Sequence, residues 1–143
     1  MTDLYVGFHP RASLRESWRL REWMMFGHVE AWLRFEDGTW LFYDPRAVGT
    51  ILRVEHRFDE VDLLLAMRFA HCETILRLPY EPSELRWPFH PTMNCAAQVG
   101  HLMGVRAYSP ARLRSILLSR GAEVIHDAQD AERGPRGEGA ARA

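Results

Sequence analysis

The amino-acid sequence predicts an α+β domain in which an antiparallel sheet packs against a helix that carries a cysteine. Three observations favour this class. Residues 28–43 alternate between apolar and polar side chains on both sides of a turn signal, which is typical of a β-hairpin. Residues 59–70 and 109–120 have apolar side chains at helical spacing. A third apolar stretch begins at Cys95, after a segment rich in turn-forming residues, and predicts the helix that covers the sheet.

The hairpin has the strongest local signal. Apolar side chains occupy every second position from 29 to 35, Asp37 and Gly38 supply a tight turn, and residues 40–43 form the return strand. We expect Pro45 and the residues after it to break the sheet, because proline has no N–H to donate to a neighbouring strand.

Shorter patterns predict the remaining elements. Alternating stretches indicate strands at 50–56, 73–78 and 122–126, the last of them at a sheet edge. A weaker pattern indicates a short helix over 13–25.

Capping residues mark the ends of the predicted helices. Asp59 is expected to cap the first long helix. Ser109 and Pro110 start the last one, which stops at Gly121. The helix that begins with the cysteine is expected to end near Gly104.

A chain of 143 residues is long enough to bury one core of its own, so we expect a single domain over residues 1–126. Residues 127–143 are rich in glycine and charge and almost free of large apolar side chains. This composition predicts a disordered C-terminal tail.

Composition disfavours several classes of function. The formal net charge is −1, which gives no field to recruit nucleic acid or an anionic membrane, so we expect neither as a partner. Without a signal peptide or a long apolar span, the protein is expected to be cytoplasmic when made. Two cysteines, Cys72 and Cys95, are too few for a disulfide scaffold.

Cys95 is the strongest candidate for a chemical role. A helix N-terminus offers unpaired N–H groups and a positive dipole end, which favour a thiolate nucleophile. His28, at the start of the hairpin, is the best candidate base, and Asp44 follows the return strand. The alternative is a purely structural role, because free cysteines are often buried and an aspartate before a proline is a frequent turn residue.

The sequence gives no support for a metal or cofactor. His56, His71, Cys72 and Cys95 lack the CxxC or HxxxH spacing of a zinc site. We therefore expect no metal and no cofactor, and a structural role for Cys72.

Three segments carry a resemblance to a known family: Gly27–Trp32, Tyr43–Pro45 and Asn94–Val99. Their order resembles that of circularly permuted papain-like hydrolases of the NlpC/P60 superfamily, in which the cysteine helix follows the histidine strand. The resemblance implies a permuted papain-like fold and a thiol amidase or peptidase that acts on a cell-envelope peptide, such as a peptidoglycan-like substrate.

The same resemblance implies a role for each site residue. Cys95 would attack the carbonyl carbon, His28 would take and return the proton, and Asp44 would hold the imidazole tautomer. The N–H of Cys95, helped by the Asn94 side chain, would stabilise the oxyanion.

Residues 27–125 are also similar to short proteins of tailed phages and prophages, which carry a similar cysteine helix and a later helix begun by Ser or Thr and Pro. This similarity implies a phage association, with incorporation in the particle. It also supports an alternative function: a noncatalytic structural or adaptor protein of the virion that uses the same fold to bind other phage proteins.

Overall fold

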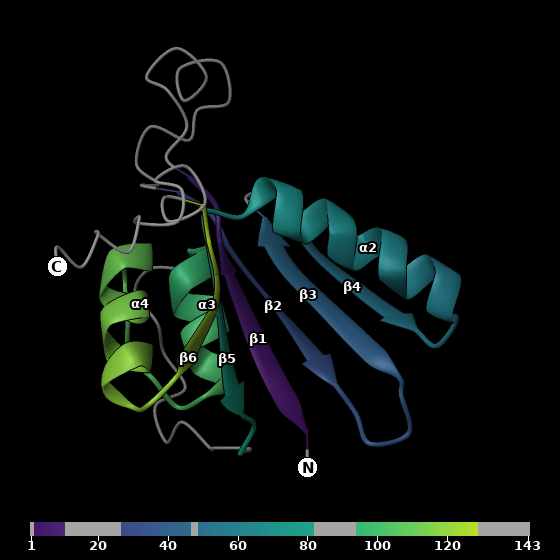
Figure 1. The fold of residues 1–143 in the computed structure, drawn as a ribbon. Coiled ribbons are helices and arrows are strands. Elements are labelled where there is room, and N and C mark those ends of the chain that lie inside the picture. The colour runs from purple at the N-terminus through teal and green to yellow at the C-terminus, as the bar shows by residue number, and fades with distance from the viewer. Residues whose placement is uncertain (1, 11–26, 47–48, 82–93, 129–143) are drawn as a thin grey trace, which may run out of the picture.

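The computed structural model describes residues 2–10, 27–46, 49–81 and 94–128 (Figure 1). In this part of the chain, a six-stranded antiparallel sheet has the strand order β4-β3-β2-β1-β5-β6, and three helices accompany it. The predicted α+β class is confirmed. The elements in chain order are β1 (Asp3–Phe8), β2 (Val29–Arg34), β3 (Trp40–Arg46), β4 (Gly49–Glu55), α2 (Phe58–His71), β5 (Thr74–Pro79), α3 (Cys95–Leu102), α4 (Pro110–Ser119) and β6 (Glu123–Asp127).

The strand β1, which was not predicted from the sequence, lies at the centre of the sheet next to β2. It pairs with β2 on one side and with β5 on the other. Leu4 and Val6 are completely buried, and Phe8 nearly so. These buried side chains alternate with Tyr5 and Gly7, which is the two-residue period of a strand. The pattern extends over only six residues.

The predicted hairpin is confirmed as β2 and β3, with Leu33 opposite Leu41. Val29 and Leu33 belong to the larger core, which α3 and α4 complete. Trp32 belongs to a second core on the opposite sheet face, together with Phe42. Both faces of β2 are therefore covered. In a hairpin with one solvated face, buried apolar side chains would alternate with exposed polar ones.

The expectation that Pro45 breaks the sheet was wrong. Pro45 lies within β3 and pairs with Thr50 of β4. The pairing of β3 with β2 ends earlier, at Ala31 and Tyr43. Within the described part of the sheet, Pro45 thus lies where β3 has a neighbouring strand on one side only, a position that tolerates the missing N–H.

Two of the three described helices begin with a capping side chain. Asn94 caps α3 by accepting from the N–H of Ala97, and Ser109 caps α4, as expected. The expectation for α2 was wrong, because Arg57 is the N-cap and Asp59 lies inside the first turn. An acidic side chain there is favourable for the helix dipole without being the cap.

Helices cover the two sheet faces unequally. In Figure 1, α3 and α4 lie together on one side of the sheet, and α2 lies apart from them near β3 and β4. Val61 is the only fully buried residue of α2, and Phe58 is 79% exposed. The larger core is therefore the one beneath α3 and α4.

Several expectations lie partly or wholly outside the described residues. They are the helix over 13–25 and most of the predicted tail. The strand β6 runs to Asp127 and so crosses the predicted domain end at residue 126. No described helix combines the length and apolar character needed to cross a membrane.

Substitution of Gly7 by alanine tests the packing at the centre of the sheet. A Cβ at this position would lie 2.7 Å from both Trp32 and the sulfur of Cys72, so Gly7→Ala must displace a rigid buried indole. We expect a loss of about 1–3 kcal/mol in the free energy of unfolding, measured by urea denaturation. Leu52→Ala, at a 62% exposed position on β4, is the control and should change stability by less than about 0.5 kcal/mol. Equal stability of the two variants would contradict this packing.

Candidate functional site

The candidate site lies where three elements meet at one end of the sheet. His28 immediately precedes β2, Asp44 lies in β3 and Cys95 is the first residue of α3. Gly27 has a φ of +99°, and a Cβ there would lie 2.8 Å from the carbonyl oxygen of His9. The N–H of His9 in turn donates to the carbonyl of His28 at 2.8 Å. A glycine before His28 thus lets the chain turn tightly into β2 against the end of β1.

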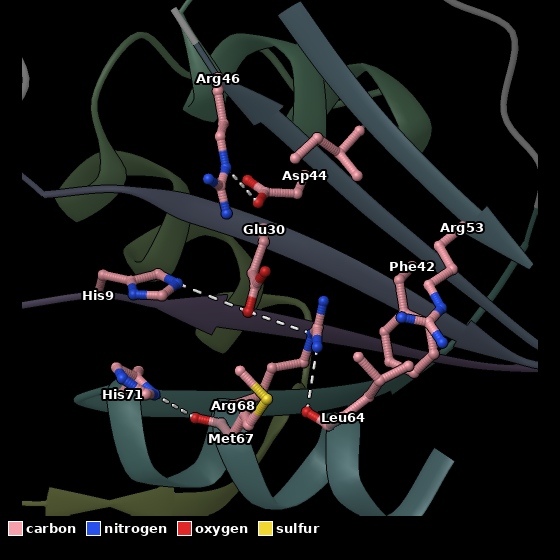
Figure 2. Close-up of a pocket in the computed structure, with 11 residues that line it drawn as sticks. His9, Glu30, Phe42, Asp44, Arg46, Arg53, Leu64, Met67, Arg68 and His71 are labelled. Carbon is pink, nitrogen blue, oxygen red and sulfur yellow. Dashed lines mark hydrogen bonds and ion pairs between the residues drawn. The ribbon is translucent and has the colours of Figure 1, made fainter. Parts of the chain in front are cut away.

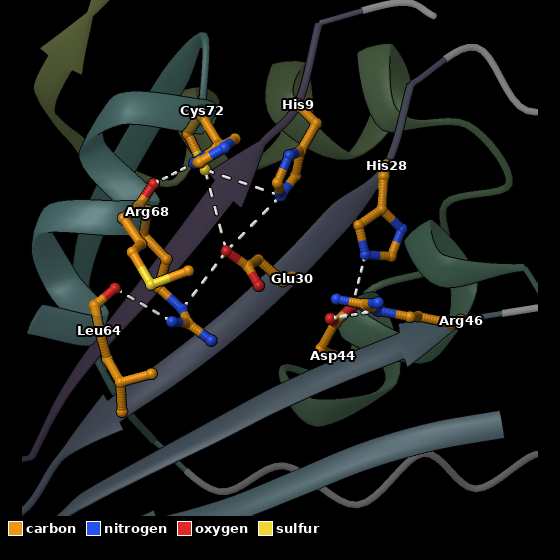
Figure 3. Close-up of polar contacts among 10 residues, drawn as sticks. His9, His28, Glu30, Asp44, Arg46, Leu64, Arg68 and Cys72 are labelled. Carbon is orange, nitrogen blue, oxygen red and sulfur yellow. Dashed lines mark hydrogen bonds and ion pairs between the residues drawn. The ribbon is translucent and has the colours of Figure 1, made fainter. Parts of the chain in front are cut away.

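The imidazole of His28 and the carboxylate of Asp44 are in direct contact. His28 Nε2 lies 2.5 Å from Asp44 Oδ1, and Arg46 Nε donates to Asp44 Oδ2 at 2.7 Å (Figure 3). The Asp44 side chain is only 6% exposed, whereas that of His28 is 28% exposed. Asp44 is therefore a buried anion with a partner on each oxygen.

The pKa of His28 is raised from 6.5 to about 9. Burial acts in the opposite direction and is the largest single influence, because it disfavours the imidazolium. Hydrogen bonding to Asp44 and the charge of that carboxylate, together with an electrostatic influence of Cys95, outweigh burial. The raised pKa keeps His28 protonated at neutral pH.

The pKa of the Asp44 carboxyl is lowered. Burial alone would raise it, but the hydrogen bonds from His28 and Arg46 and their positive charges have the greater effect. The Asp44 carboxyl is consequently ionised in the folded protein at neutral pH.

Cys95 is 2% exposed and packs among apolar side chains of the larger core, including Val29 and Val99. It lies in the first turn of α3, where the N–H of Ala97 is satisfied by Asn94 and the first intrahelical bond runs from Gln98 to Asn94. The backbone N–H of Cys95 precedes this bond and points out of the helix N-terminus.

The Asn94 side chain has structural partners on both of its polar atoms. Its oxygen accepts from Ala97, and its nitrogen donates to the carbonyl of Tyr108 at 2.8 Å. These bonds fix the start of α3 and the loop before α4. The predicted role of Asn94 at the oxyanion stays a prediction.

Sequence reasoning missed two residues around the site, Arg46 and Gln98. Arg46 lies two residues after Asp44 in β3, so both side chains are on the same face of the strand. This i, i+2 spacing is the sequence feature that could have identified Arg46. Gln98 lies about one turn after Cys95, and its Oε1 accepts hydrogen bonds from Tyr43 at 3.3 Å and from Thr50 at 3.4 Å. These contacts tie α3 to β3 and β4.

A cavity of about 370 Å³ opens beside Asp44, between the sheet and α2 (Figure 2). Glu30, Asp44 and Arg46 line it from the sheet, and Arg68 lines it from α2. The described residues that line this cavity do not include Cys95.

A second polar cluster lies next to the first. His9, at the end of β1, approaches both Glu30 and Cys72, and its ring centroid lies 5.2 Å from that of His28. Burial and the charge of Glu30 raise the pKa of the Cys72 thiol to about 12, even though Arg68 lowers it somewhat. Cys72 is therefore protonated, and as a free thiol it is a poor nucleophile.

Comparison of the chain with protein-family models, with curated proteins and with solved structures gave no match.

The raised pKa of His28 predicts how stability depends on pH. Folding raises this pKa, so the protonated ring stabilises the fold fully below about pH 6.5, and the contribution disappears as the pH rises through about 9. We expect the free energy of unfolding to fall by up to about 3 kcal/mol across this window. Urea denaturation at pH 6.5 and pH 9.5 measures the change. His28→Ala serves as the control, and an equal decline in that variant would show that other groups cause it.

Proposed function

We propose that the protein is a thiol hydrolase, an amidase or peptidase of permuted papain-like arrangement. The observation that supports this most is the position of His28, whose ring interacts with the Asp44 carboxylate and with the Cys95 thiol. A nucleophile, a base and an orienting acid are the three parts of a cysteine hydrolase. They come from three distant stretches of chain.

The proposed mechanism uses one ring nitrogen of His28 for each partner. Asp44 holds Nε2, which leaves Nδ1 of His28 for the proton of the Cys95 thiol. Transfer of that proton gives a thiolate beside an imidazolium, which the raised pKa of His28 favours at neutral pH. Asp44 keeps the ring oriented and is itself held by Arg46.

The reaction would proceed in two steps. The Cys95 thiolate attacks the amide carbonyl carbon, the C–N bond breaks, and His28 gives its proton to the leaving amine. Water then attacks the resulting thioester, His28 takes a proton from the water, and the thiolate leaves as the carboxylic acid product forms. The backbone N–H of Cys95, which lies at the start of α3, would donate to the oxyanion in both steps.

The substrate class follows from the resemblance to NlpC/P60 hydrolases. It implies a peptide amide of the cell envelope, such as a peptidoglycan stem peptide, and the likeness to phage proteins implies a role in a tailed particle. Entry of a substrate requires access past His28, the most exposed of the three groups.

Hydrolysis of peptidoglycan fragments tests this function. We expect the wild type to release new amino groups from purified muropeptides, detected by mass spectrometry of the products. Cys95→Ala and His28→Ala should lose activity, and Asp44→Asn should lose at least about 100-fold because it alters the tautomer of His28.

Cys72→Ala is the matched control for this experiment, because it removes the other buried thiol. It should leave the rate within a few-fold of the wild type. Activity that survives Cys95→Ala would refute the proposed mechanism.

A second candidate function, a noncatalytic virion adaptor, is favoured by a different surface. Among the described strands, the edge strand β4 pairs only with β3, and its apolar side chains are exposed: Ile51 by 49%, Leu52 by 62% and Val54 by 62%. Phe58, at the start of α2, is also exposed. An exposed apolar edge strand is suited to pairing with another chain.

The two functions respond to different substitutions. If the protein is an adaptor, Leu52→Lys with Val54→Lys should prevent its incorporation into phage particles, measured by immunoblotting purified virions. Cys95→Ala should then be incorporated and should support infection normally. Loss of infectivity in Cys95→Ala particles of normal composition would favour the hydrolase instead.

A further inference from the structure

We propose that His9, Glu30 and Cys72 form a binding site for a divalent transition metal of the zinc class. The three residues come from the end of β1, from β2 and from the end of α2, and their donor atoms face one another (Figure 3). Glu30 is 4% and Cys72 3% exposed, so two of the three ligands are buried. The site is independent of the proposed hydrolase chemistry.

The spacing of the donor atoms matches tetrahedral coordination. Nε2 of His9 lies 3.5 Å from Oε1 of Glu30 and 3.8 Å from the sulfur of Cys72, and the sulfur lies 3.9 Å from Oε1. Ordinary zinc bond lengths place two tetrahedral ligands about 3.3–3.6 Å apart. Each separation therefore needs to shorten by only a few tenths of an ångström for one ion to contact all three atoms.

The same geometry distinguishes a metal site from a second catalytic triad. In a triad, the nucleophile and the acid contact opposite nitrogens of the histidine. Here Glu30 and Cys72 both approach Nε2 of His9. Three donor atoms around one point form a ligand set, and imidazole, carboxylate and thiolate together suit zinc.

Backbone hydrogen bonds hold the three ligands in place without a metal. The N–H of His9 donates to the carbonyl of His28, and the N–H of Glu73 donates to the carbonyl of Phe8, both at 2.8 Å. The N–H of Cys72 caps α2 by donating to Arg68. These bonds anchor His9 and Cys72 directly or through a chain neighbour, and Glu30 is held within β2, where it pairs with Gly7 of β1.

The thiolate of Cys72 and the carboxylate of Glu30 supply the two negative charges that neutralise a divalent ion. Without a metal, Arg68 lies 3.4 Å from Oε1 of Glu30 and compensates the carboxylate. On binding, the proton of Cys72 passes to solvent and the thiolate coordinates the ion. His9 and Glu30 line the 370 Å³ cavity, so the fourth coordination position faces it and would hold water.

Cobalt(II) is the probe for this site. The purified, metal-free protein is titrated with Co²⁺ under reducing conditions, and the absorption spectrum is recorded. We expect one equivalent to bind, with intense bands of tetrahedral cobalt and a thiolate charge-transfer band in the near ultraviolet. Zn²⁺ should displace the cobalt and abolish these bands.

Variants locate the ion. Cys72→Ala should remove the thiolate band, and Glu30→Gln, which preserves shape, should weaken binding at least about 10-fold. His71→Ala is the matched control, since His71 lines the same cavity but its Nδ1 contacts the carbonyl of Met67. It should bind cobalt like the wild type, and so should Cys95→Ala.

Two results would overturn the proposal. One is a folded wild-type protein that binds no cobalt or zinc at micromolar concentrations. The other is a thiolate band that disappears in Cys95→Ala and persists in Cys72→Ala, which would place the ion at the candidate hydrolase site. Circular dichroism of each variant verifies that it is folded.

Discussion

The contact between His28 and Asp44 is the interaction on which the rest of the candidate site depends. It joins the start of β2 to the end of β3, and it places a cationic ring beside a buried carboxylate. Burial opposes the charge on the ring, so the imidazolium persists only because Asp44 and Cys95 both favour it. Without Asp44, neither the orientation nor the protonation of His28 would be fixed. The position of Asp44 depends in turn on Arg46, which donates a hydrogen bond to the second oxygen of the carboxylate.

Antiparallel pairing explains why two polar clusters lie together. The end of β1, the start of β2 and the start of β5 meet at one end of the sheet, since Phe8 pairs with both Val29 and Thr74. Beyond this row the apolar core gives way to polar side chains. His28 interacts with Asp44 and the thiol of α3, while His9 turns to Glu30 and the thiol at the end of α2. One sheet end therefore supports a proposed hydrolase site and a proposed metal site on separate cysteines.

Sequence reasoning reached the elements with strong local signals and missed those defined by tertiary pairing. The hairpin and the helix start at Ser109 follow from turn and capping residues, and both could be predicted. The central strand β1 could not, because its six residues carry too short a pattern. The interaction of His28 with Asp44 and Cys95 was expected from the order of the segments. The grouping of His9 with Cys72 depends on the register of β1, and no local spacing of these residues indicates it.

The reactivity of the two thiols toward iodoacetamide in the native protein tests the central claim most directly. Rates at pH 7 are measured by mass spectrometry of the peptides that contain Cys95 and Cys72. If His28 and Asp44 prepare a thiolate, Cys95 should be alkylated at least about 10-fold faster than Cys72, and His28→Ala should remove the difference. The pKa of Cys72, about 12, makes it the internal reference. Equal inertness of both thiols, or an unchanged rate at Cys95 in His28→Ala, would contradict the account.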